Sequence, residues 1–233
     1  MGRRVQQQIE ERNASRSSSR KRTSAAKLLP YSPRLCSAQK LSIRPEQPPI
    51  EDSLLEFGCR DWQREPVVFS ILDESHSKPE IVMVAELRLT ELRVFEKVEN
   101  GKKPFILLEL LDSDTTMARI KHPNGSVAYK FNQTASGEMS IQERSRRDQP
   151  FMQVRQQPSV VASLGKLFGF ASTSSKFHLS QNATLQAQLE PKTGDSGRQF
   201  PVLKFAPNCT DPQARAVALA FGLCWACASC VLA

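Results

Sequence analysis

The sequence predicts an all-β protein in which roughly twelve antiparallel strands close into a barrel around a hydrophobic C-terminal helix. From Leu54 onward, short apolar runs recur every ten to fifteen residues and are separated by turn residues. This spacing is typical of antiparallel barrels and sandwiches. The last eighteen residues, 216–233, carry no charge at all. An apolar helix of that kind must be covered on every side, either by protein or by lipid.

The apolar runs give the predicted strands. Val127, Tyr129 and Phe131 alternate with polar residues, as a strand with one buried face requires. Asn100-Gly101 and Asn124-Gly125 are strong hairpin turns. The segment Val160–Phe170 is also apolar but contains two glycines, and it fits either a strand or a short helix. The other predicted strands are 66–72, 80–89, 92–98, 105–111, 115–121, 127–131, 139–142, 151–155, 176–180, 184–189 and 199–205.

The C-terminal stretch predicts one long helix over about 211–230. Asp211 is suited to the N-cap and Pro212 to the first helical position. A barrel of twelve strands is too wide to be filled by strand side chains alone, so a central helix would supply its core. At about 25 cal/mol per Å², burial of such a helix is worth more than about 10 kcal/mol before entropy is counted. Small side chains would let the walls approach it closely: Ala214, Ala216, Ala218, Ala220, Gly222, Ala226 and Ala228.

Charge and proline content divide the chain into a disordered basic tail, residues 1–52, and a barrel domain, residues 53–233. Residues 1–49 hold 11 of the 32 Lys and Arg residues and only 3 of the 24 acidic residues, whereas the remainder is balanced. The tail is either a solvated segment without a partner or an arm for anionic lipid or nucleic acid. Its densest basic run contains Arg16, Arg20, Lys21 and Arg22.

The N-terminus has no apolar run typical of a secretory signal, so we expect an intracellular protein with reduced cysteines. Cys224, Cys227 and Cys230 recur at steps of three, which on a helix gives a slanted stripe instead of a metal cage. They suit small buried side chains, with palmitoylation as the alternative. No metalloprotease, nucleophile-elbow or phosphate-loop motif occurs, so we expect no enzyme, no metal and no cofactor.

The end of the chain resembles the tubby, phospholipid scramblase and LURP-one superfamily. The residues that carry the resemblance are a strand from Gln199, the acidic residue Asp211, and the Ala/Val/Leu/Gly-rich run to Gly222, together with the turn His122–Val127. It extends over roughly residues 57–230. The resemblance implies a twelve-stranded barrel around a C-terminal helix and an association with lipid.

Two parts of the resemblance concern ligands. Scramblases carry an acidic calcium-binding segment before the final helix, but Phe205–Asp211 has a single carboxylate here. Calcium usually collects 6–8 oxygens, so a calcium site is implied by the resemblance but poorly supported by these residues. Tubby-like proteins bind phosphoinositides through basic residues on barrel strands, which implies a patch of Arg119, Lys121, His122 and Lys130. The alternative for these four is an ordinary solvated sheet face.

We therefore expect a non-enzymatic, monomeric, membrane-peripheral protein that binds anionic phospholipid or phosphoinositide, in the cytoplasm and at membranes, or in the nucleus. Movement of phospholipids is a further activity that the scramblase resemblance implies. Two alternatives stay open. One is a tail-anchored membrane protein that uses residues 216–233 as its anchor. The other is a regulatory factor that binds nucleic acid or protein through its basic tail.

Overall fold

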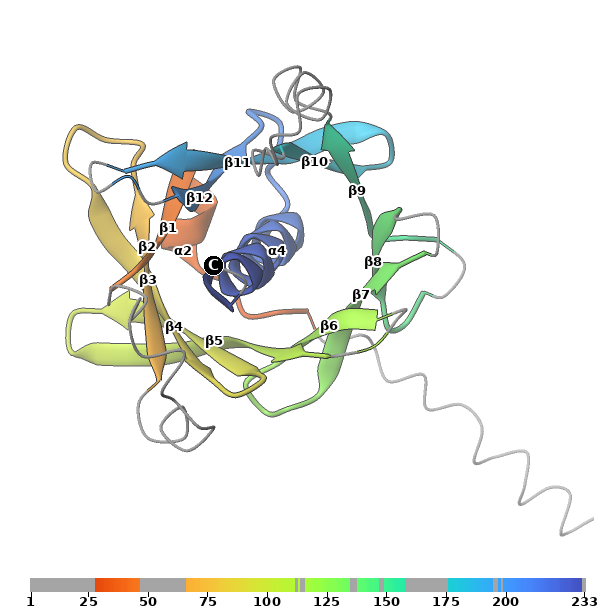
Figure 1. The fold of residues 1–233 in the computed structure, drawn as a ribbon, viewed down its shortest axis with the longest axis horizontal. Helices are drawn as coiled ribbons and strands as arrows, with labels where there is room; N and C mark the ends of the chain where they lie inside the picture. The colour runs from red at the N-terminus through yellow and green to blue at the C-terminus, as the bar shows by residue number, and fades with distance from the viewer. Residues whose placement is uncertain are drawn as a thin grey trace, which may run out of the picture.

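The computed structural model contains a closed barrel of twelve antiparallel strands around a C-terminal helix, α4 (Figure 1). This confirms the predicted fold class. The structure describes residues 28–46, 66–111, 113, 116–134, 138–146, 149–157, 176–194, 197 and 199–231, and the side chains of 228–231 are outside this description. The predicted tail residues Arg16, Arg20, Lys21 and Arg22 lie outside the described residues.

The barrel is an up-and-down meander in which each strand pairs with the next one along the chain. β1 pairs with both β2 and β12 and so closes the ring. A closed ring leaves no unpaired strand edge. The strands are β1 (Lys40–Pro45), β2 (Val67–Asp73), β3 (Glu80–Arg88), β4 (Glu91–Val98), β5 (Gly101–Leu110), β6 (Thr116–Lys121), β7 (Val127–Gln133), β8 (Met139–Glu143), β9 (Met152–Gln157), β10 (Lys176–Gln181), β11 (Thr184–Thr193) and β12 (Gln199–Phe205).

Eleven of these strands, β2 to β12, coincide with predicted runs to within a few residues. The segment Val160–Phe170, which fitted either a strand or a short helix, lies outside the described residues. Gly125 has a φ of 84° in the turn between β6 and β7, which explains the need for glycine there.

The predicted boundary between tail and barrel at residue 53 is wrong, because the first barrel strand precedes it. Leu41 and Ile43 point inward and are fully buried, while Lys40 and Arg44 alternate with them on the outside. Neighbouring prolines and basic residues gave this stretch the composition of a linker. Its alternation of apolar and polar residues is nevertheless that of a strand, and β1 completes the ring.

Helix α4 (Pro212–Val231) begins where it was predicted to begin. The Asp211 carboxylate accepts a hydrogen bond from the backbone N–H of Gln213 at 2.9 Å, which is the expected N-cap contact. The side chains of residues 216–220 are all fully buried. Figure 1 shows the helix inside the ring of strands. Residues 216–220 are thus enclosed by the protein's own wall.

The helix lies against one side of the barrel, because Gly222 has no side chain. A Cβ at this position would lie 3.0 Å from Ile43 Cδ1 on β1 and 3.4 Å from Leu189 Cδ1 on β11. Gly222 therefore allows a close approach between α4 and these two strands. Phe221, by contrast, packs its ring toward β7 and β10, on another side of the helix.

A buried arginine fixes the first turn of α4. Arg215 donates from Nε to the carbonyl of Cys209 at 2.7 Å, and from Nη1 to the carbonyls of Leu35 (3.0 Å) and Ala38. Its guanidinium also lies 4.4 Å from the centre of the Phe205 ring. These contacts tie the helix to the short helix α2 (Pro33–Ser37), which closes this end of the barrel.

Gln213 makes a second link between α4 and the segment before α2. Its side-chain oxygen accepts from the backbone N–H of Leu29 at 2.8 Å, and its side-chain nitrogen donates to the Leu29 carbonyl at 3.1 Å. Residues 28–38 therefore belong to the folded domain and hold the start of the helix in place.

We predict that Gly222→Leu lowers the free energy of unfolding by about 1–3 kcal/mol, because the new side chain overpacks the contact with Ile43. Adding Ile43→Ala to this variant should recover part of the loss, since the two changes meet in one contact. Chemical denaturation of both variants measures the effect. A neutral or stabilising Gly222→Leu, as helix propensity alone would give, contradicts the close approach.

We predict that Arg215→Met lowers the free energy of unfolding by about 2–5 kcal/mol, because buried carbonyls lose their donors. The matched control is Arg34→Met, which removes an exposed ion pair with Glu80 and should cost under about 1 kcal/mol. Urea unfolding curves of both variants give the comparison. An equal loss of unfolding free energy in the two variants would contradict the stabilising role of the buried hydrogen bonds of Arg215.

Candidate functional site

An apolar pocket of about 150 Å³ lies inside the barrel beside the second half of α4. Side chains from β6 to β10 form one wall and the helix forms the other. Apart from Asn132 and Ser140, every lining residue is apolar or carries sulfur. The lining consists of Met117, Phe131, Asn132, Met139, Ser140, Ile141, Val154, Phe177, Phe221, Cys224 and Trp225.

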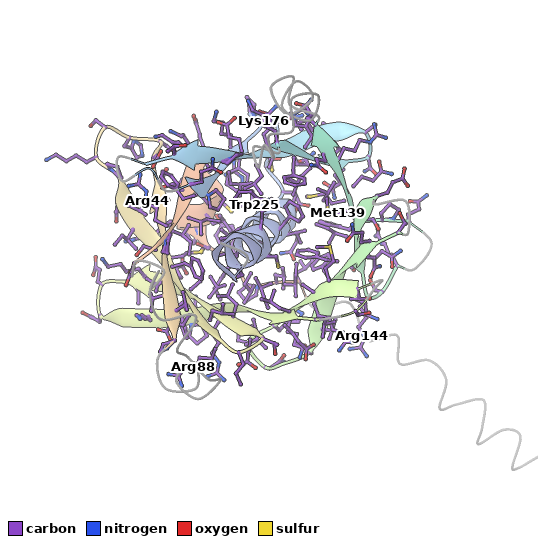
Figure 2. All side chains as sticks on the ribbon, in the orientation of Figure 1. Arg44, Arg88, Met139, Arg144, Lys176 and Trp225 are labelled. Atoms are coloured by element: carbon purple, nitrogen blue, oxygen red, sulfur yellow. The ribbon has the colours of Figure 1, made fainter. Side chains whose placement is uncertain are left out.

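The pocket exists because α4 is packed closely against β1 and β11 and leaves room on the other side. Phe221 partly fills this room, with its ring centre 6.0 Å from that of Phe131 and 5.6 Å from that of Phe177, both in edge-on contacts. In Figure 2, Met139 lies on the wall across from Trp225 of the helix. Phe131, Phe177 and Phe221 also line the pocket.

The pocket opens toward the end of the barrel at which α4 finishes. Its lining residues come from the start of β6, β8 and β10 and from the end of β7, which meet at this rim. Met117 is 40% exposed and Trp225 is half-buried, so both lie at the opening. Met117 is also the extra residue of a bulge between β6 and β7. Bulges are frequent at barrel rims next to binding sites.

The cysteines on α4 contribute apolar surface. Burial raises the pKa of the Cys224 thiol well above its ordinary value, so the thiol stays protonated at neutral pH. Cys227 is buried, and the side chain of Cys230 lies outside the described residues. Within the described ranges, no group of three or more His, Cys, Asp or Glu side chains could hold a metal ion.

Arg119, Lys121 and Lys130 of the predicted phosphoinositide patch lie together on β6 and β7, where the carboxylate of Glu109 accompanies them. Arg119 and Lys121 both form ion pairs with Glu109 of β5, at 3.2 and 3.0 Å. The hydrogen bond from Lys121 lowers the pKa of Glu109. Lys130 is exposed and lies opposite Arg119 in the register.

His122 does not belong to this surface, because it is buried. Its backbone N–H donates to the Ser126 carbonyl at 2.9 Å within the turn between β6 and β7. The backbone of His122 thus helps to close this turn.

A larger basic face, which the sequence did not reveal, covers the outside of β9 to β12 and β1. The register places Lys204 of β12 beside Lys40 of β1, and His178 of β10 beside Arg155 of β9. Three carboxylates, Glu46, Glu74 and Glu190, accompany the cations. The six cations of this basic face are Lys40, Arg44, Arg155, Lys176, Lys192 and Lys204.

Glu74 holds three of these cations together. Its carboxylate lies 2.8 Å from Lys40 Nζ, 2.6 Å from Arg44 Nη2 and 4.0 Å from Lys192 Nζ. Burial alone would raise the pKa of Glu74, but hydrogen bonds from Lys40, Ser42 and Arg44 outweigh burial and lower it to about 2. Arg44 also lies over the Phe200 ring, 4.7 Å from its centre.

Comparison with family models, with curated proteins and with solved structures finds no match for this chain. The closed twelve-stranded barrel with a C-terminal helix is compatible with the tubby-like fold that the sequence resembles. In the described part of the chain, no helix combines the length and the hydropathy that a membrane span requires.

We predict that acid destabilises the wild-type protein more than the Glu74→Gln variant between about pH 4.5 and 2. The folded-state pKa of Glu74 is depressed from 4.5 to about 2, so its stabilising effect is present above the unfolded-state value and is lost as the pH falls through this window. The difference should be on the order of 1 kcal/mol after solvent screening. Urea denaturation of both proteins at pH 6, 4 and 3 measures this difference. If their free energies of unfolding fall in parallel with pH, the lowered pKa of Glu74 is contradicted.

Proposed function

We propose that the protein is a non-enzymatic, membrane-peripheral lipid-binding protein of the tubby and scramblase kind, and that its basic face binds anionic phospholipid or phosphoinositide head groups. The observation that carries the proposal is the basic face on β9 to β12 and β1, where six cations accompany three carboxylates. The architecture supports the family assignment, since the strand count and the enclosed helix are those that the resemblance implies.

The basic face supports head-group binding through position as well as charge. A Lys or Arg close to an anionic membrane contributes about 1 kcal/mol of attraction. In Figure 2, Arg44 and Lys176 lie on the same side of the barrel, whereas Arg88 and Arg144 lie on the opposite side. Strand pairing fixes the backbone positions of these residues, so only their side chains have to become ordered on binding. Phosphate groups accept charge-assisted hydrogen bonds from Arg and Lys side chains.

We predict that the triple variant Arg155→Gln, Lys176→Gln, Lys192→Gln binds phosphoinositide-containing vesicles about 100-fold more weakly than the wild type, at about 1 kcal/mol per charge. Co-sedimentation with vesicles of phosphatidylcholine, with and without phosphatidylinositol bisphosphate, gives the affinities. All three side chains are exposed, so the fold should be unaffected.

The matched control variant is Arg93→Gln, Lys97→Gln, Lys103→Gln, which removes one arginine and two lysines from the exposed surface of β4 and β5. It should keep wild-type binding. Equal loss in both variants would point to net charge alone, and equal binding of the wild type to neutral vesicles would exclude head-group recognition.

The wild-type protein used for the vesicle experiments also tests the tail-anchor alternative. To act as an anchor, α4 would have to leave the barrel and give up the hydrogen bonds of Arg215. Alkaline carbonate should therefore release the wild-type protein from membranes, whereas an anchored protein would stay in the pellet. A factor that binds nucleic acid through the basic run at Arg16, Arg20, Lys21 and Arg22 would instead lose this binding when residues 1–27 are deleted, a change that keeps α2 and β1.

A further inference from the structure

We infer that the apolar pocket between α4 and β6 to β10 binds the terminal part of one hydrocarbon chain of a lipid. The inference deepens the proposed function. It rests on that function for the identity of the head group, but the chain site stands on the pocket alone.

The size and lining of the pocket specify an apolar group. Its volume of about 150 Å³ is that of cavities which stay dry and take up benzene-sized ligands. Asn132 has its side-chain amide engaged with Gln142 (2.8 Å) and its oxygen with Thr116 (3.3 Å). A polar ligand would therefore find few free partners, and its desolvation would be uncompensated.

The opening at the rim favours a chain over a compact molecule. The pocket lies beside the part of α4 that carries Cys224 and Trp225, and Met117 and Met139 line it from the wall. Methionine side chains are flexible and adapt to the shape of a ligand. A chain longer than the pocket can thus continue past the two methionines to the end of the barrel.

The basic face and the pocket meet at the beginning of β10. The Phe177 ring lines the pocket, and the preceding residue, Lys176, lies on the outer surface and pairs with Glu190 at 3.5 Å. Successive residues of a strand point to opposite faces, so one strand serves both surfaces. A single lipid could therefore place a chain end in the barrel and keep its anionic group near the rim.

The test uses Trp225 as a reporter in the full-length chain. The sequence has two tryptophans, so Trp62→Phe leaves Trp225 as the only one. The probes are dodecanoate brominated at its terminal carbon and dodecanoate brominated at the carbon next to the carboxylate, both below the concentration at which they form micelles. Bromine quenches tryptophan fluorescence on contact. We expect saturable quenching by the terminal bromine and little by the other.

Two substitutions at one position provide the controls. Cys224→Phe fills the pocket and should weaken the terminal-bromine quenching at least tenfold, whereas Cys224→Ala removes the thiol without filling the pocket and should keep it. Circular dichroism and thermal unfolding confirm folding, and Val154→Phe replaces Cys224→Phe if that variant does not fold. Equal quenching by both bromine positions, or unchanged quenching after filling, would overturn the inference.

A neutral probe separates this inference from the proposed function. Dodecanol brominated at its terminal carbon has the same chain without the charge. If it quenches Trp225 while the basic-face triple variant keeps full vesicle binding, the chain site holds and head-group recognition fails. If neither terminally brominated probe quenches while vesicle binding still depends on the basic face, the chain site fails and the proposed function holds.

Discussion

The structure depends on the mutual burial of an apolar helix and a wide barrel. Residues 216–220 are fully buried, so α4 needs a wall on all sides of this stretch. A ring of twelve strands has an interior that strand side chains alone do not fill. The helix therefore needs the barrel to cover it, and the barrel needs the helix to fill its interior. Arg215 and Gln213 then fix the depth and rotation of the helix, because their hydrogen bonds reach the backbone of residues 28–38.

The distribution of side-chain size on α4 makes this enclosed helix one wall of the apolar pocket. Gly222 lets the helix approach β1 and β11, while Phe221 and Trp225 occupy the opposite part of the interior. Phe221 meets Phe131 and Phe177 there in edge-on contacts, and all three rings line the pocket. The pocket is thus a consequence of asymmetric packing.

The sequence was sufficient for the strands, the helix and its N-cap, because alternation, hairpin turns and capping are local patterns. It failed at β1, where prolines and basic residues concealed the alternation of Leu41 and Ile43. The basic face could not be predicted, since Lys40 and Lys204 meet only through the register of the closing strands. The pocket was equally hidden, because it follows from how closely α4 approaches one wall.

The carboxylates within the basic face have two opposing effects. Glu74 lies within 4.0 Å of three cations, and without it their mutual repulsion would push the flexible side chains apart. The same carboxylate lowers the net positive charge that an anionic head group meets. A phosphate would bind as a second anion beside cations that are already close together. These cations would attract it, but it would have to compete with the Glu74 carboxylate for their hydrogen bonds. Under the proposed function, the basic face would therefore favour a multiply charged head group over a singly charged one, because several phosphates would compensate for this competition.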